Sequence, residues 1–331
     1  MKIAILGCGA IGGLFLGRLR RENQDVVGIV KDYQRDSLVK DGLIIEGSDG
    51  RQNIKVNVDT RLREKVDLAI FSTKINNLEE VINANSRYLK EAILVTTQNG
   101  IKADYILCDH FEKSKIVTGI VMFGATFYAP NRIVHNFGDG LILGNIFDGK
   151  TDSLEKAQDL LSNVFDTSSL ENIKGAKYLK LFINLNNCIP AVLGLSMQEV
   201  FSDLEFAKLA IELNKEAYKV IAKSGIQLRS LPTYPKERIE SLVSMDINQA
   251  SALFSKIMTS LSKEPLYGSI LQSIKRSRKS EIDYINGEIV NLAQNNNLQA
   301  PLNERIVQAV KKVEESGNFL DKNEFFEYMN N

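Results

Sequence analysis

The first half of the chain alternates between short apolar runs and longer stretches in which apolar residues recur every three to four positions. The short runs are rich in β-branched residues and end at turn residues, which is typical of buried strands. The longer stretches have the spacing of amphipathic helices. Together they predict a doubly wound parallel sheet. Strands are predicted at 3–6, 26–30, 67–72, 92–97 and 116–122, with crossover helices at 76–89 and 101–112.

The pattern changes between Phe123 and Gly144. Ile133 to His135 and the segment from Gly138 to Gly144 predict a hairpin with glycine turns, which would close the sheet with antiparallel strands. We expect His135 to be a structural or surface residue of this edge element.

Beyond about residue 152 the strand signals fade and helical periodicity takes over. The predicted fold class is therefore α/β, with an N-terminal Rossmann-type doubly wound sheet followed by an all-α C-terminal domain. We place the two domains at 1–170 and 171–331. Helices are predicted at 153–165, 174–194, 203–224, 235–262, 270–297 and 301–315.

Composition narrows the class of protein. The 331 residues suit two domains, and 41 basic against 41 acidic residues argue against a partner of nucleic acid. Three cysteines without C-x-x-C spacing favour a reducing compartment and neither a disulfide scaffold nor a zinc site. No apolar run approaches the roughly 20 residues of a membrane helix. We expect a cytoplasmic protein without a metal or a membrane partner, and a homodimer remains open.

Three glycines connect the first predicted strand to a helix. Gly7, Gly9 and Gly12 have G-x-G-x-x-G spacing, and the helix that follows carries Arg18 at its far end. The first glycine permits a tight turn, the second lets a pyrophosphate approach the backbone, and the third lets helix and strand pack closely. The segment predicts a dinucleotide site at the helix N-terminus, and a glycine-rich turn that binds nothing is the alternative. The predicted cofactor contacts are Gly7, Cys8, Gly9, Ala10, Ile11 and Gly12.

The second predicted strand ends in Lys31-Asp32, about 20 residues beyond the glycine turn, where dinucleotide folds read the adenosine ribose. An acid there binds the 2′-hydroxyl of NAD, whereas a base accommodates the 2′-phosphate of NADP. Because Lys31 comes first and Arg35 is close enough to assist, NADP(H) is favoured over NAD(H). A solvated charge pair in a turn is the alternative.

Two further polar residues follow predicted strands. Lys74 comes after the third strand, and Asn99 comes after the fourth within Gln-Asn-Gly. Ligands of open parallel sheets bind outside the carboxyl ends of the strands, on the same edge as the glycine turn. Lys74 and Asn99 are therefore candidate contacts of cofactor or substrate.

A polar stripe crosses an apolar helix of the second half. Lys180, Asn184 and Asn187 are spaced four and three residues apart and therefore share one helix face. Such groups are costly in an apolar setting unless they have partners, so this stripe is either a satisfied core network or a site. With only two histidines in the chain, a lysine, a carboxylic acid or a tyrosine is a better candidate than imidazole for a proton donor.

A second polar segment runs from Ser269 to Gly287. Ser280 and Asp283 have the spacing of a capping box with Asp in place of Glu, which would put Glu281 in the first turn of a new helix. The simplest explanation of the acidic pair is that it complements the helix dipole. The basic residues between Lys275 and Lys279 are typical of a solvated face.

Together these motifs resemble the ketopantoate reductase family over nearly the whole chain. The twelve-residue spacing from Ser269 to Glu281 is the most specific of them. The resemblance implies reduction of a small-molecule 2-oxo acid, ketopantoate, to pantoate with NADPH, a step towards pantothenate and coenzyme A. It also implies Lys180 as general acid and Glu281 as a carboxylate that meets cofactor ribose and substrate. The substrate contacts that it implies are Asn99, Asn184, Asn187 and Ser269, and the cofactor contacts are the glycine turn, Lys31, Lys74, Asn99, Ala125 and Glu281.

Three positions depart from the family pattern. Lys31 stands where the family often has arginine, Cys188 lies four residues after Asn184 where a second asparagine is common, and Ser273 stands where Asp often follows Gln. These departures are compatible with a paralogue that reduces another 2-oxo acid. An opine-type dehydrogenase and an NADP(H)-binding redox sensor without catalysis are further alternatives. An opine-type dehydrogenase usually relies on a catalytic histidine. A redox sensor without catalysis would be expected to have lost Lys180 or Glu281, and both are present.

Overall fold

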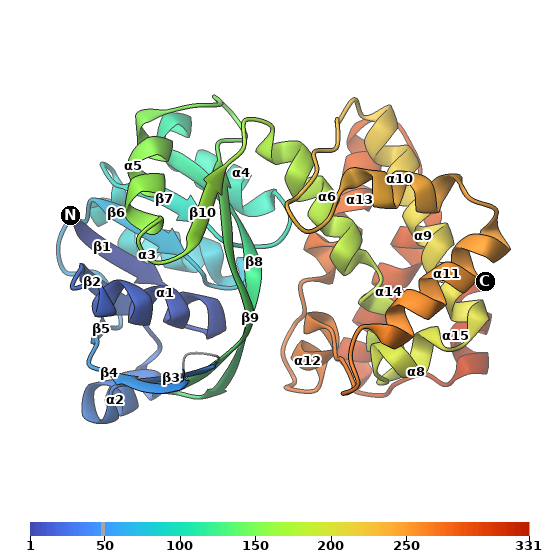
Figure 1. The fold of residues 1–331 in the computed structure, drawn as a ribbon, viewed down its shortest axis with the longest axis horizontal. Helices are drawn as coiled ribbons and strands as arrows, with labels where there is room; N and C mark the ends of the chain where they lie inside the picture. Colours follow the sequence, from blue (N-terminus) through green and yellow to red (C-terminus); the bar gives the residue numbers. More distant parts are fainter. Residues whose placement is uncertain (48–49, 331) are drawn as a thin grey trace. The chain divides into compact units, whose positions relative to one another are not determined.

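The computed structural model describes residues 1–47 and 50–330. This part of the chain divides into two compact units, Met1–Ile173 and Lys174–Asn331, called here the N-terminal unit and the helical unit (Figure 1). The first holds a ten-stranded sheet with helices, and the second is built of helices. The predicted fold class is confirmed.

Six parallel strands form one side of the sheet, in the order β5-β2-β1-β6-β7-β8, with β5 at its edge. The chain moves outward from β1 to β2 and β5, then returns past β1 to β6, β7 and β8 on the other side. Doubly wound sheets bind ligands at this reversal of strand order. The strands are β1 (Lys2–Leu6), β2 (Asp25–Ile29), β5 (Asn57–Asp59), β6 (Leu68–Phe71), β7 (Ile93–Thr96) and β8 (Ile116–Ala129).

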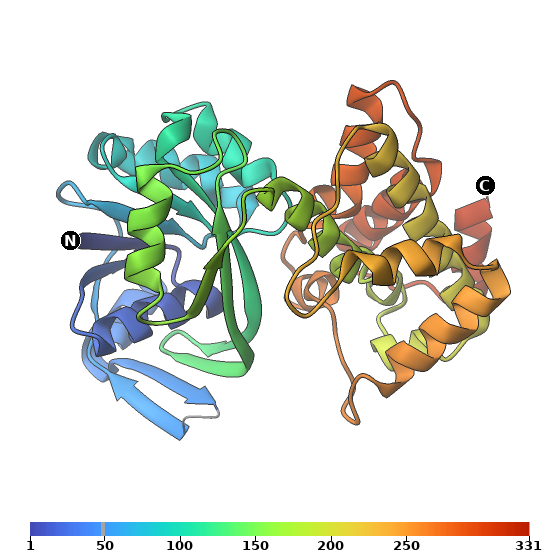
Figure 2. The same cartoon turned by 45° about the horizontal axis from the view of Figure 1, so that its top comes forward.

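Antiparallel pairing extends the sheet beyond β8, as the sequence predicts. Strand β9 (Arg132–Gly144) runs antiparallel to β8, and the two form the long green arrows of Figure 1. The outer edge of β9 is shared, because β3 (Leu43–Gly47) pairs with its first part and β10 (Asp166–Ser169) with its last. Strand β4 (Gly50–Ile54) completes a hairpin with β3, the light-blue pair in Figure 2.

The predicted glycine turns within residues 123–144 are wrong. The chain reverses at Pro130 and Asn131, both of which favour turns, and β9 then continues through Gly138 without interruption. Gly138 has a φ of +72°, and a Cβ there would lie 2.5 Å from the carbonyl oxygen of Met122. The glycine therefore serves a close approach at an irregularity of the β8–β9 ladder.

An aromatic core joins two helices of the N-terminal unit to the sheet. The ring of Phe165 lies 4.5 Å from Phe15 of α1 and 4.9 Å from Phe123 of β8, and Leu161 of α5 belongs to the same buried cluster. This packing fixes α1 against the strands whose carboxyl ends carry the candidate site. The helices and 3-10 turns are α1 (Ala10–Arg21), α2 (Asp32–Asp41), η1 (Ile75–Asn77), α3 (Leu78–Leu89), α4 (Lys102–Cys108), η2 (Lys113–Lys115) and α5 (Asp152–Leu161).

The helical unit packs its helices around a buried apolar core. Its described residues contain no strand, only an isolated bridge between Leu231 and Tyr234. The elements are α6 (Ile173–Leu185), α7 (Cys188–Leu193), α8 (Met197–Phe201), α9 (Leu204–Lys223), α10 (Lys236–Ser244), α11 (Ile247–Ser260), α12 (Ser269–Ile274), η3 (Ile282–Tyr284), α13 (Asn286–Asn295), α14 (Pro301–Ser316) and α15 (Lys322–Asn330).

Three of the predicted long helices are interrupted. Residues 174–194 form α6 and α7, because Pro190 has no N–H for the carbonyl of Asn186 and its ring would clash there. Residues 235–262 form α10 and α11, since the Asp246 side chain accepts from the backbone N–H groups of Asn248 and Gln249 and so begins a new helix. Residues 270–297 form α12, η3 and α13, and Ser277 between them has a φ of +51°.

Candidate functional site

The glycine turn has the geometry that its spacing predicts. Gly7 has a φ of +98°, and a Cβ there would lie 2.6 Å from the backbone nitrogen of Thr73. A Cβ on Gly12 would lie 2.1 Å from the carbonyl oxygen of Gly7, so α1 packs directly on the turn. The N–H of Gly7 donates to the carbonyl of Ile29 at 3.1 Å, which ties the turn to β2.

Gly9 differs from Gly7 and Gly12 because nothing lies within 4 Å of the position that a Cβ would occupy. Gly9 is exposed and is the N-cap residue of α1, which begins at Ala10. Among the described residues, no side chain accepts a hydrogen bond at this cap. The space at Gly9 is therefore open beside the N-terminus of α1, a position that suits an anionic group. Cys8 is buried, and its carbonyl accepts from Nε2 of Gln34 at 3.1 Å.

Strands β6 and β7 are locked together where they end. The Gln98 side chain donates to the carbonyls of Phe71 and Thr73 at 3.1 and 3.0 Å. Lys74 and Asn99, the two candidates from sequence, directly follow these residues, and both are half-buried. The structure thus brings them to the same sheet edge as the glycine turn. Gln98 is the residue that the sequence reasoning missed here.

Lys31 and Ala125 are the other two candidates of the N-terminal unit. Lys31 is exposed at the N-terminus of α2, directly after β2, and Asp32 begins that helix. Ala125 is half-buried in β8 and pairs with His135 of β9.

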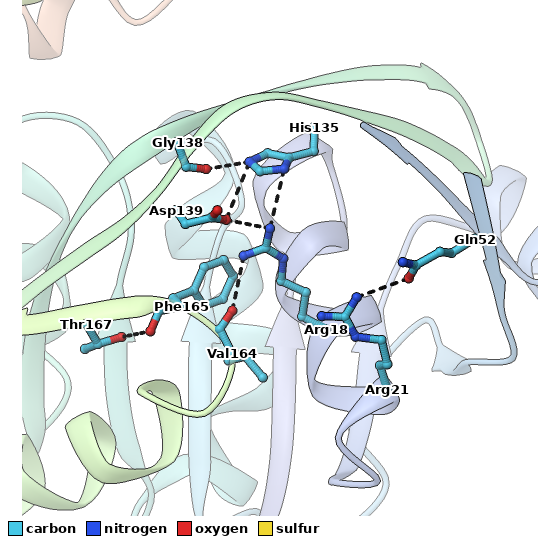
Figure 3. A network of polar contacts seen from close by, with 9 residues as sticks. All are labelled: Arg18, Arg21, Gln52, His135, Gly138, Asp139, Val164, Phe165 and Thr167. Atoms are coloured by element: carbon cyan, nitrogen blue, oxygen red, sulfur yellow. Dashed lines mark hydrogen bonds and ion pairs between the residues drawn. The ribbon is translucent and has the colours of Figure 1, made fainter. Parts of the chain in front are cut away.

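His135 and Arg18 belong to one polar network (Figure 3). The Arg18 guanidinium lies 2.6 Å from the Asp139 carboxylate, donates to the carbonyl of Val164 at 3.1 Å, and approaches Nδ1 of His135 at 3.4 Å. Nε2 of His135 lies 2.6 Å from the carbonyl oxygen of Gly138, so the ring donates from Nε2 and accepts at Nδ1. This network ties the last turn of α1 to β9, while the glycine turn holds the beginning of the helix.

In the helical unit, α6 presents the polar stripe. Lys180 and Asn184 are half-buried, and Asn187 is buried just beyond the end of the helix. Nδ2 of Asn187 lies 3.4 Å from Oδ1 of Asn184, and its backbone N–H donates to the Asn184 carbonyl at 3.0 Å. The helix break before Pro190 therefore keeps the two amides together.

The amine of Lys180 lies in a desolvated setting. Burial first, and then the positive charge of Lys177, lower the pKa of Lys180 from 10.5 to about 7, against the opposing effect of the Glu281 carboxylate. Lys177, one helical turn earlier and itself buried, is a residue that sequence reasoning missed, although its spacing of three residues from Lys180 was a usable signal. At neutral pH this amine can both hold and give up a proton.

Ser269 and Cys188 differ in their exposure to solvent. A Cβ on Gly268 would lie 3.0 Å from Cβ and Cγ of Asn187, so the backbone before Ser269 packs directly against the stripe. Ser269 itself is exposed at the first residue of α12. Cys188 is fully buried, and its thiol donates to the carbonyl of Leu185 at 3.0 Å. The thiol of Cys188, four residues after Asn184, is thus turned into the core. The amide next to Asn184 belongs to Asn187.

The acidic segment is organised differently from the predicted capping box, which is wrong. The Ser280 hydroxyl accepts from the N–H of Ile282, but the N–H of Ser280 donates to Glu314 rather than to Asp283. Asp283 is exposed and pairs with Lys311 at 2.7 Å. Because only the 3-10 turn η3 follows, Glu281 lies half-buried before it instead of inside a regular helix, and its charge acts on Lys180.

Metal ligands and membrane helices can be checked in residues 1–47 and 50–330. No group of three or more His, Cys, Asp or Glu side chains is placed to hold a metal ion there. Among those residues, no helix has the length and apolar character needed to cross a membrane.

A doubly wound unit with a glycine turn, followed by a helical unit with a desolvated lysine, is typical of a dinucleotide-dependent oxidoreductase. Family models agree with this class: residues 3–147 match "Ketopantoate reductase PanE/ApbA" and residues 172–314 match its C-terminal model. The chain belongs to the ketopantoate reductase family, as its sequence motifs indicate.

Individual relatives align with this chain over most of their length. A 2-dehydropantoate 2-reductase of Pyrococcus abyssi is 32% identical over 92% of this chain and 94% of its own. A second enzyme of that name, from Pyrococcus horikoshii, is 29% identical over 96% and 99%. Among solved structures, a D-mandelate dehydrogenase with NADH and anilino(oxo)acetate is 25% identical with a TM-score of 0.81, covering 96% of this chain and 99% of that one. A family member from Ralstonia eutropha shares the fold, with 21% identity, a TM-score of 0.80 and coverage of 96% and 99%.

Proposed function

We propose that the protein is a 2-dehydropantoate 2-reductase, which reduces ketopantoate to pantoate with NADPH and uses Lys180 as proton donor. The desolvated amine of Lys180 is the observation that carries this proposal, because its pKa of about 7 suits proton transfer at neutral pH. The two Pyrococcus relatives with this name support the substrate.

The chemistry requires a group that stabilises developing negative charge. The nicotinamide, when bound, supplies a hydride to the 2-oxo carbon, and the carbonyl oxygen becomes an alkoxide that must be protonated. The Lys180 ammonium donates a hydrogen bond to that oxygen and then its proton. Asn184, Asn187 and Ser269 hold the carboxylate and hydroxyl of the substrate through amide and hydroxyl donors. Glu281 partly offsets the lowering of the Lys180 pKa and accepts hydrogen bonds from substrate or ribose hydroxyls.

The N-terminal unit fits a dinucleotide. Gly9 leaves the open space that a pyrophosphate needs, next to the N-terminus of a twelve-residue helix. Lys74 and Asn99 follow neighbouring strands on the same edge and are the candidates for ribose and nicotinamide contacts. Lys31, exposed where β2 ends, favours the 2′-phosphate of NADP over the 2′-hydroxyl of NAD.

Replacing Lys31 with alanine is expected to weaken NADPH binding about tenfold, the size of one charged hydrogen bond, and to change NADH binding little. Isothermal titration with the two cofactors measures this. Lys40→Ala, which removes an exposed lysine from the last turn of α2, is the matched control and should leave both affinities unchanged. An NADPH-to-NADH affinity ratio that survives in Lys31→Ala would assign the phosphate contact elsewhere.

A second candidate is the reduction of a different 2-oxo acid, favoured by the D-mandelate dehydrogenase at 25% identity. Ser273 and Cys188 also depart from the family pattern. A panel of 2-oxo acids, ketopantoate and phenylglyoxylate included, assayed by oxidation of NADPH and NADH, distinguishes the two. The proposal predicts the highest kcat/KM with ketopantoate and NADPH. A preference for an aromatic acid would favour the second candidate, added amine that accelerates oxidation would indicate an opine-type reaction, and no turnover at all would indicate a binding protein.

A further inference from the structure

The segment from Ser262 to Gly268 joins α11 to α12 and leads directly into Ser269. It contains neither helix nor strand, and two of its large side chains, Leu266 and Tyr267, are 38% and 42% exposed. Apolar side chains at such exposure do not hold a segment in place by burial. The Lys275 ammonium lies 4.5 Å from the centre of the Tyr267 ring, and the rest of the positioning comes from hydrogen bonds to the backbone.

Gln198 supplies three of these hydrogen bonds. Its Nε2 donates to the carbonyls of Ser262 and Glu264 at 3.2 and 2.9 Å, and its Oε1 accepts from the N–H of Leu266 at 2.9 Å. The N–H of Met197, the preceding residue, donates to the carbonyl of Leu266 at 2.9 Å. One amide side chain thus binds three backbone groups that are 64 to 68 residues away in sequence.

The three hydrogen bonds from the Gln198 side chain to residues 262–266 are called here the Gln198 clamp. The helix that carries Gln198 is itself fixed at its start. Ser196 and Glu199 form a capping box at the start of α8, with the Ser196 hydroxyl accepting from the N–H of Glu199 at 3.2 Å. Gln198 therefore projects from a defined first turn of the helix. At the other end of the segment, Nε2 of Gln272 donates to the carbonyl of Tyr267 at 2.9 Å.

Gly268 connects the position of residues 262–267 to the polar stripe, because its backbone packs against Asn187. A Cβ at Gly268 would lie 3.0 Å from Asn187 and 3.1 Å from Cε of Met197, so the backbone passes closely between them. No larger residue fits that gap without movement. The path of residues 262–268 therefore determines where Ser269 begins α12 relative to Asn187.

We propose that Gln198 is a positioning residue for substrate binding, which acts by holding residues 262–268 so that Ser269 and Asn187 face the same ligand. This inference rests on the proposed function, in which those two residues bind the 2-oxo acid. Gln198 itself touches neither cofactor nor substrate. Its effect should therefore appear in KM for the 2-oxo acid and not in cofactor affinity.

Gln198→Leu, which keeps the size of the side chain and removes all three hydrogen bonds, tests the inference. We expect KM for the 2-oxo acid to rise about tenfold, with kcat changed less and NADPH affinity unchanged. In a Ser269→Ala background Gln198→Leu should raise KM little further, because both substitutions remove the same contact between Ser269 and the substrate. Gln249→Leu, at an exposed glutamine of α11, is the matched control. An unchanged KM, or effects of Gln198 and Ser269 that simply add, would overturn the inference.

A second measurement does not depend on the reaction. Hydrogen exchange of the Leu266 amide should accelerate in Gln198→Leu, while the Tm stays within the range of the Gln249→Leu control. Unchanged exchange would show that Gln198 does not hold the segment. If exchange accelerates but no 2-oxo acid is reduced by the wild-type protein, the clamp stands and the proposed function fails.

Discussion

Lys180→Met is expected to slow single-turnover reduction of the 2-oxo acid about 10²–10³-fold, the loss typical of removing one donor to a developing oxyanion. Methionine keeps the length and apolar stem of lysine but can neither donate a hydrogen bond nor carry charge. Rapid-mixing measurement of NADPH oxidation isolates the chemical step from product release. NADPH affinity should remain near the wild-type value, because the glycine turn lies in the N-terminal unit.

The fold should tolerate this substitution. A half-buried amine beside the positive charge of Lys177 is not a stabilising element, so the Tm of Lys180→Met should match or exceed that of the wild type. Lys180→Arg keeps a permanent positive charge and separates charge stabilisation from proton donation. A loss of less than tenfold in Lys180→Met, with intact cofactor binding, would remove Lys180 from the mechanism.

Alanine at Gly9 and alanine at Gly12 should both weaken NADPH binding, but they should differ in their effect on stability. The Cβ at Gly9 enters open space on an ordinary extended backbone, so the free protein should keep its Tm while NADPH affinity falls by about tenfold or more, because the methyl group occupies the approach of the pyrophosphate. The Cβ at Gly12 meets the carbonyl oxygen of Gly7 at 2.1 Å. Two backbone segments must then separate, which should cost about 1–3 kcal/mol of unfolding free energy as well as cofactor affinity.

Thermal unfolding with and without NADPH measures both effects. For Gly9→Ala we expect the wild-type Tm and a reduced shift on adding cofactor, whereas Gly12→Ala should begin from a lower Tm. Gly50 and Gly225 share the open environment of Gly9, but their φ values of +82° and +71° make both unsuitable as alanine controls. Unchanged NADPH affinity in Gly9→Ala would place the pyrophosphate away from this turn.

The central strands could be predicted because they are buried on both faces. β1, β6 and β7 consist of residues such as Ile, Leu, Val and Ala, and each is bounded by turn residues. The edge strands could not be. β4 reads Gly-Arg-Gln-Asn-Ile and β10 reads Asp-Thr-Ser-Ser, so neither has an apolar period. They exist because their backbones pair with strands already in place. The helix α2 and the C-terminal helix α15 were likewise absent from the predictions.

Helix ends in the second half were harder to predict than the helices themselves. The apolar period continues from α6 into α7, and only the missing N–H of Pro190 ends the first helix at Leu185. A prediction from the apolar period alone therefore merges α6 and α7 into one helix. The break between them is what keeps Asn184 and Asn187 together.

The sequence names candidate site residues where a single element carries them. Strand ends gave Lys74 and Asn99, and helical spacing gave Lys180 and Asn184. Contacts between distant segments were not predictable. Gln198 meets its partners across more than sixty residues, and the effect of Glu281 on the Lys180 amine follows from the fold of η3 and not from the capping box that the sequence predicts.

The pH dependence of kcat/KM tests the role of Lys180 most directly, because that ratio reports ionisation in the enzyme before substrate binds. Reduction requires the protonated amine, and the pKa of Lys180 is about 7, so the proton is present below that pH and lost above it. For the wild type we predict a level profile on the acid side of pH 7 and a fall approaching tenfold per pH unit on the alkaline side, while Lys180→Arg stays level because its guanidinium does not titrate there. A wild-type profile that remains level to about pH 9.5 would contradict proton donation by this amine.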